Sequence, residues 1–196
     1  MILYNLKKKG KSMFKKIFNI FIIILAVFFT FTNKAHAVAD YGPNWVKPVI
    51  SVYIPQGHAY SEMFLHAFQK WENSSFGQLK FQYVTKMPAD IETVFVSKAD
   101  GTDEGAGSYT IIVQGGKIIK AQIAIAAVPT EFSNQMIFTT MLHEIGHALG
   151  LADSNRKLGI MHSPVLETQD LITNDIVKLF RLNGWSFMNK GTESSF

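Results

Sequence analysis

The sequence contains, at residues 143–153, the stretch H-E-I-G-H-A-L-G-L-A-D, at the end of an apolar segment that predicts a long helix over 131–149. Residues four apart in a helix are about 40° apart around its axis, so His143 and His147 share one face. Two imidazoles at this spacing can each give a nitrogen to one tetrahedral metal ion. Glu144, beside the first histidine, can reach a water bound to that ion without being a ligand itself. The stretch therefore predicts a metal site on a helix.

A third ligand is needed, because two histidines alone do not hold a catalytic zinc ion. Gly150 is expected to end the helix in a left-handed conformation, which other residues adopt at a cost. The chain can then turn back toward the histidines, and Asp153 follows three residues later with a carboxylate. Carboxylate oxygen is an accepted zinc ligand. Glu167, 20 residues after His147, is an alternative third ligand, although Gly150 then has no explanation.

The stretch resembles the extended zinc motif of the metzincin metalloproteases, and its details resemble the matrixin branch. The resemblance covers most of residues 45–185. The Glu167 alternative is instead similar to the thermolysin-like arrangement. The further segments that resemble matrixins are Phe68-x-x-Trp71, Leu79-x-Phe81, Ala121-Gln122-Ile123-Ala124-Ile125, Gly159-Ile160-Met161, Asp175 with Leu179, and Gly184-Trp185.

The resemblance implies a role for each residue of the stretch. His143, His147 and Asp153 would be the ligands of one catalytic zinc ion, and Glu144 would be the general base that takes a proton from the zinc-bound water. Met161, eight residues after Asp153, would be the floor beneath the metal.

The resemblance also implies how a substrate is held. The strand Ala121–Ile125 would be the edge strand along which a substrate chain lies extended, with Ala121 and Ile123 in contact with it. Ser163, Pro164 and Val165 would line one wall of the pocket for the residue after the scissile bond.

Three departures from the matrixin pattern bear on cofactors. Matrixins usually have histidine where this chain has Asp153. The chain has no cysteine, so latency through a propeptide cysteine is excluded. No histidine occurs between His66 and His143, so we expect no structural zinc.

Calcium could bind Asp100, Asp103 and Glu104 in the Gly-rich loop 101–107, but we favour a solvated acidic loop, since the sequence does not show the closure that oxygen ligands need.

The remaining pattern predicts an α+β, three-layer domain, which the resemblance makes zincin-like: a twisted mixed sheet of about five strands, the long active-site helix, a Met-turn and a C-terminal helix. Strands are expected at 49–54, 79–84, 91–96, 109–113 and 118–126, and helices at about 59–73, 131–149 and 168–182.

The pattern of the N-terminal residues indicates an export signal. Residues 1–37 combine a lysine-rich head, a short apolar run and the site Ala35-His36-Ala37, which is typical of a secretory signal peptide. We therefore predict that residues 38–196 form one secreted domain. The alternative is a membrane anchor at 17–33 that leaves the domain outside.

Charge argues against nucleic acid as a partner. The formal net charge is +4, but residues 1–37 hold seven lysines and no acidic residue, which leaves 12 basic and 15 acidic residues, or −3, in the rest. A hydrophobic content of 47% with 17% charged residues excludes a disordered chain. We expect a monomer whose only membrane contact is through the signal segment.

Together these features predict a secreted zinc-dependent metalloendopeptidase that acts on protein or peptide substrates. Two hypotheses from other functional classes remain open. Two histidines and a carboxylate also describe a non-haem iron oxygenase site, although that chemistry has no use for Glu144. A non-catalytic extracellular binding module with a retained metal site is the other, and an intact Glu144 argues against it.

Overall fold

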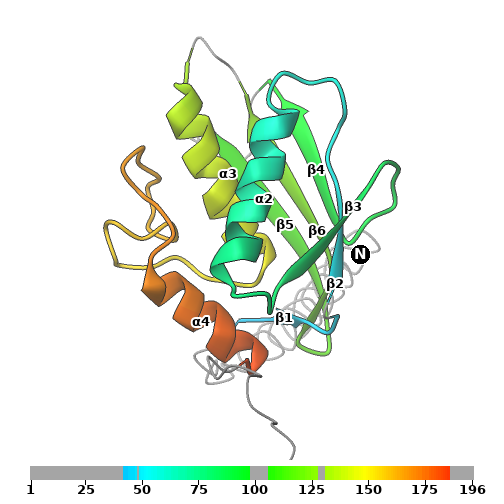
Figure 1. Ribbon diagram of the computed structural model, residues 1–196. Coiled ribbons are helices and arrows are strands. Elements are labelled where there is room, and N and C mark those ends of the chain that lie inside the picture. The colour runs from blue at the N-terminus through cyan, green and yellow to red at the C-terminus, as the bar shows by residue number, and fades with distance from the viewer. Residues whose placement is uncertain (1–41, 48, 98–105, 128–130, 186–196) are drawn as a thin grey trace, which may run out of the picture. The chain divides into compact units, whose positions relative to one another are not determined.

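The computed structural model describes residues 42–47, 49–97, 106–127 and 131–185 (Figure 1). The predicted signal segment, residues 1–37, lies outside the described residues, as do Asp100, Asp103 and Glu104 of the predicted acidic loop. Among the described residues, no helix is long and apolar enough to cross a membrane.

A mixed sheet of six strands forms the base of the described domain (Figure 1). Its strand order is β1-β6-β4-β2-β3, all in parallel pairs, and β5 pairs with β6 in antiparallel orientation. Five of the six strands were expected from the sequence; β1, only two residues long, was not. The strands are β1 (Asn44–Trp45), β2 (Val49–Tyr53), β3 (Lys80–Val84), β4 (Ile91–Val96), β5 (Gly107–Gln114) and β6 (Lys117–Ala126).

The prediction that Ala121–Ile125 form an edge strand is wrong. These residues belong to β6, which is hydrogen-bonded to β4 on one side and to β5 on the other. Ala121 and Ile123 are 1% and 0% exposed and cannot touch a substrate. Alternation of residue types reports which face of a strand is buried, but it does not report whether the strand has a neighbour on each side. Among the described strands, the antiparallel one at the open edge is β5.

The hairpin between β5 and β6 follows from its two glycines. Gly115 and Gly116 have φ values of 58° and 76°, and two successive positive φ values are what a two-residue hairpin turn requires. The turn sets the register, in which Tyr109 pairs with Ile123 and Gly107 pairs with Ile125.

Three helices complete the described domain, and α2 and α3 lie together over one face of the sheet (Figure 1). They are α2 (Ser61–Ser74), α3 (Asn134–Ala148) and α4 (Thr173–Asn183). The prediction of a mixed α+β fold is confirmed, although α4 begins five residues later than expected. The reason is that Asp175 accepts a hydrogen bond from the Ile172 backbone N–H, which caps the helix at that point.

Buried aromatic residues position α3. Phe64, Phe68 and Trp71 of α2 are fully buried between the helices and the sheet. The Trp71 indole N–H donates to the Leu142 carbonyl at 2.9 Å, and the Trp45 indole N–H donates to the Ala148 carbonyl at the same distance. The helix that carries both histidines is thus tied to α2 at its middle and to β1 at its end.

The C-terminal end of α3 requires a glycine. Leu151 N donates to Gly146 O and Gly150 N donates to His147 O, the paired bonds of a Schellman motif. Gly150 has φ 97°, and a Cβ at this position would overlap the backbone carbonyl oxygen of Pro43. Both the backbone angle and the close chain crossing therefore require glycine, as the sequence predicted for the helix end.

Replacing Gly150 with alanine should lower the free energy of unfolding by roughly 2–4 kcal/mol, from left-handed backbone strain and from steric overlap together. Gly116→Ala is the matched control, because Gly116 also has a positive φ but has nothing within 4 Å of the added Cβ. It should cost only the strain, about 1–2 kcal/mol. Urea unfolding of both variants measures the difference, and equal losses would contradict the proposed clash.

Candidate metal centre

The side chains of His143 and His147 project from adjacent turns of α3 and converge at their tips. Their Nε2 atoms are 2.9 Å apart, and the residues are only 4% and 6% exposed. Asp153 Oδ1 lies 3.6 Å from Nε2 of His143 and 3.4 Å from Nε2 of His147. Among the described residues, these three form the group of ligand-type side chains that could share a metal ion.

Two backbone carbonyls determine where the ring protons sit. His143 Nδ1 lies 2.7 Å from Ile160 O, and His147 Nδ1 lies 2.8 Å from Leu151 O. A carbonyl only accepts, so each Nδ1 must carry the proton that it donates. Burial lowers the pKa of both imidazoles, and the neighbouring His143 lowers that of His147 further. Both rings are therefore neutral at neutral pH, with an unprotonated Nε2.

This protonation state makes the cluster suitable for a cation. Two unprotonated nitrogens face each other at 2.9 Å beside a carboxylate oxygen, with no proton available between the nitrogens. Such an arrangement is repulsive unless a positive ion lies among the three atoms. Tetrahedral zinc with bonds of about 2.0–2.1 Å requires ligand atoms about 3.3 Å apart, close to the separations found here. The donor set and its spacing fit zinc.

Glu144 lies next to the cluster and does not join it. The residue is 6% exposed, and its Oε2 has no hydrogen-bond partner among the described residues. Burial raises the pKa of Glu144 to about 8, and the charge of Asp153 adds to the shift. A cation bound nearby would lower this pKa again, since it favours the carboxylate form. The side chain is therefore a buried acid or base with a free oxygen.

Met161 packs beneath the helix between the two histidines. It is fully buried, and its sulfur lies so close to Gly146 that any Cβ there would overlap it. The adjacent Ile160 is held from both sides: its N–H donates to Asp175 Oδ2 at 3.1 Å, and its carbonyl accepts from His143. Asp175, 0% exposed, thus connects α4 to the loop that orients the first histidine.

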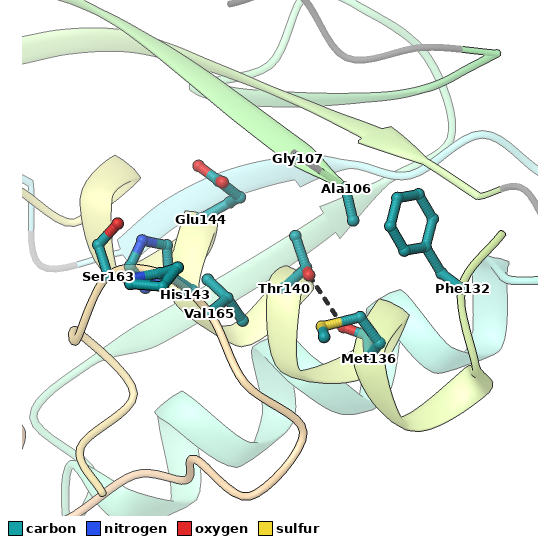
Figure 2. Close-up of a pocket in the computed structure, with 10 residues that line it drawn as sticks. Ala106, Gly107, Phe132, Met136, Thr140, His143, Glu144, Ser163 and Val165 are labelled. Carbon is teal, nitrogen blue, oxygen red and sulfur yellow. Dashed lines mark hydrogen bonds between the residues drawn. The ribbon is translucent and has the colours of Figure 1, made fainter. Parts of the chain in front are cut away.

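A pocket of about 390 Å³ opens beside His143 and Glu144 (Figure 2). Ser163, Pro164 and Val165 line one wall of it, and the first strand residue of β5, Gly107, lines another. Figure 2 shows His143, Glu144 and Ser163 toward one end of this group and the apolar side chains of Phe132 and Met136 toward the other. The lining residues are Ala106, Gly107, Phe132, Met136, Thr140, His143, Glu144, Ser163, Pro164 and Val165.

Several of these residues were not expected from the sequence. Phe132, Met136 and Thr140 precede Glu144 at steps of four residues, a helical spacing that could have predicted a shared face. Gly107 packs so closely on the helix that a Cβ would come within 2.8 Å of Glu144 Cγ. No local signal in the sequence predicts that contact, because it depends on how β5 lies against α3.

Tyr109 is another residue that the sequence did not single out. Its ring stacks on the His147 imidazole with centroids 4.2 Å apart and planes 15° from parallel. Burial, followed by the carboxylates of Asp153 and Glu144, raises its pKa, so the phenol is neutral at neutral pH.

Glu167 lies away from the cluster. Its Oε1 accepts a hydrogen bond from the Ser133 hydroxyl, and Ser133 is the N-cap of α3. Ten residues of helix, about 15 Å along the axis, separate that cap from His143. The arrangement gives no support to Glu167 as the third ligand.

The mixed sheet, the two histidines of α3 and the pocket beside them define a metallopeptidase-type domain. A model of the matrixin family matches residues 50–182, more than half of the chain. The chain therefore belongs to the matrixin family, whose members are zinc metalloendopeptidases. No curated protein matched the chain in a separate comparison.

Removing the metal should make stability fall as the pH rises from about 7 to 8. Glu144 keeps its proton in the folded protein to about 8, whereas the histidines, with an ordinary pKa of 6.5, are mostly neutral in both states above about pH 7. In this window the folded state binds more protons than the unfolded state, so stability falls as the pH rises. The fall is up to about 1 kcal/mol across this window, since a full proton difference corresponds to about 1.4 kcal/mol per pH unit. Urea unfolding of chelator-treated protein measures it. Glu144→Gln should abolish the fall, and an unchanged slope in that variant would refute its assignment to Glu144.

The choice of third ligand is tested by comparing zinc content in two variants. Asp153→Ala should weaken zinc binding by more than the roughly 10–100-fold that loss of an outer-shell partner costs. Glu167→Ala should leave zinc affinity close to that of the unsubstituted protein. Competition with a chromogenic chelator gives both affinities, and loss of zinc in Glu167→Ala alone would reverse the assignment.

Proposed function

We propose that this chain is a secreted zinc-dependent endopeptidase in which His143, His147 and Asp153 hold one zinc ion and Glu144 is the general base. The observation that supports this most directly is the free Oε2 of Glu144, buried beside two unprotonated nitrogens and a carboxylate oxygen that fit a zinc ion. Bound there, zinc would act as a Lewis acid toward the scissile carbonyl and lower the pKa of water.

Glu144 would move protons at its free oxygen. In its carboxylate form, Oε2 accepts a proton from the attacking water, and the same oxygen then donates it to the leaving amine. The pair of carbonyl acceptors at Ile160 and Leu151 would keep both imidazoles in one tautomer and orientation. Burial of the carboxyl group excludes bulk water from the proton transfer.

The open edge of β5 is the best-placed surface for an extended substrate. Among the described strands β5 pairs with β6 alone, which leaves the backbone groups of its other edge available for β-augmentation. Antiparallel addition is the commoner pairing, and a substrate added in that way runs from the Gln114 end toward Gly107. This role replaces the one predicted for Ala121 and Ile123.

The direction of an added substrate strand would determine which side of the cut bond lies at the pocket. Gly107 lines the pocket, so a substrate that runs toward Gly107 would place the residue after the scissile bond there. Phe132, Met136 and Val165 favour a large apolar side chain at that position. Ser163 and Pro164 would form the wall opposite the helix.

Several parts of the proposal rest on the sequence alone. One such part is export through residues 1–37 with cleavage after Ala37, and its alternative is a membrane anchor at 17–33. The monomeric state and the absence of nucleic-acid partners are also inferred from the sequence alone. Calcium at Asp100, Asp103 and Glu104 stays a prediction that we do not favour.

Glu144→Ala should lower the rate of casein cleavage by about 100-fold or more, the usual contribution of a general base, while zinc content is unchanged. Glu62→Ala is the control, because Glu62 is an exposed acidic residue in the first turn of α2 and should cleave normally. A Glu144→Ala protein that binds zinc and cleaves at the original rate would refute the mechanism. Absence of chelator-sensitive cleavage by the unsubstituted protein would favour a non-catalytic binding module.

A further inference from the structure

Tyr109 covers one face of a proposed metal ligand and also faces solvent. Its ring lies 4.2 Å from the His147 ring and 15° from parallel to it. The tyrosine is 42% exposed, whereas His147 is 6% exposed. Single exposed apolar residues are ordinary on protein surfaces. An exposed aromatic ring stacked on a buried ligand-type histidine is a more specific arrangement, because a molecule that contacts the tyrosine then lies next to the cluster.

Tyr109 contacts the part of the cluster that does not line the pocket. Gly107 packs against Thr140 and Glu144, and Tyr109, two residues further along β5, packs against His147. The strand and α3 therefore advance in the same direction along this contact. Gly107 and Glu144 line the pocket, and neither Tyr109 nor His147 does.

We propose that Tyr109 is a specificity-determining residue that receives an apolar side chain of the substrate on the N-terminal side of the cut bond. The inference rests on the proposed function and on antiparallel addition of the substrate to β5. A substrate that runs from the Gln114 end toward Gly107 passes Tyr109 before it reaches the pocket. Its residues before the cut bond therefore lie near the tyrosine, and those after the cut bond lie near the pocket.

The chemistry of the ring defines what it would select. One face is already occupied by His147, so the exposed part of the ring offers a flat apolar surface to a leucine, proline or aromatic side chain. The preference should depend on the ring and not on the hydroxyl. Tyr109→Phe should therefore keep this preference, and Tyr109→Ala should lose it.

Peptide binding tests the inference without relying on catalysis. The full-length chain carrying Glu144→Ala and loaded with zinc is combined with Tyr109→Ala or Tyr109→Phe. Fluorescence anisotropy then measures binding of peptides that carry either a large apolar residue or glycine at each position before the expected cut. Tyr83→Ala is the matched control, because Tyr83 is 39% exposed on β3, at the other edge of the sheet.

Tyr109→Ala should weaken binding of the apolar peptides by about 3–10-fold, the range expected for loss of an aromatic contact, and should change binding of the glycine peptides little. Tyr109→Phe should keep the preference, and zinc content should be the same in every variant. An equal loss for all peptides, a loss of zinc or no loss at all would overturn the inference, the first two by showing that Tyr109 only holds His147 in place.

Cleavage by the protein with Glu144 intact separates this inference from the proposed function. If peptides bind with the expected dependence on Tyr109 but none is cleaved, the peptidase proposal fails and the binding role of Tyr109 stands. If peptides are cleaved and the Tyr109 variants show the same preferences as the unsubstituted protein, the peptidase proposal stands and the role of Tyr109 fails. If no peptide is bound or cleaved, both fail.

Discussion

The site depends on two hydrogen bonds from histidine to backbone carbonyls. Ile160 O and Leu151 O each accept the Nδ1 proton of one ring, and this leaves two bare Nε2 atoms 2.9 Å apart. Without those acceptors, either ring could rotate or place its proton on Nε2, and the cluster would no longer be a set of lone pairs. The loop after α3 is thus as important for the cluster as the helix that carries the two histidines.

That loop is held in turn by contacts that are distant in sequence. The N–H of Ile160 donates to the buried carboxylate of Asp175, and the sulfur of Met161 fills the space that Gly146 leaves on the helix. The turn at Gly150 sends the chain back beneath the histidines, and its backbone crosses that of Pro43 too closely for a side chain. These contacts hold the loop against α3 and α4.

Local sequence patterns predicted most elements because local chemistry determines them. The helical period and the glycine after α3 specify where that helix begins and ends to within a few residues. The pair Gly115-Gly116 specifies a hairpin. The two-residue strand β1 was missed because so short a strand carries no pattern. The edge strand was assigned wrongly because pairing on both sides of β6 is a property of the whole sheet.

The sequence by itself determined that His143 and His147 share a helix face with Glu144 beside them, because four-residue spacing on a helix leaves no other outcome. It also determined that the helix must end at Gly150. Only the tertiary structure decided that Asp153, and not Glu167, lies within reach of both rings. It alone also decided that, among the described strands, β5 and not β6 has an open edge. Those outcomes depend on where a loop and a strand pack against α3, and packing of that kind joins residues whose spacing in the chain carries no information about their distance in space.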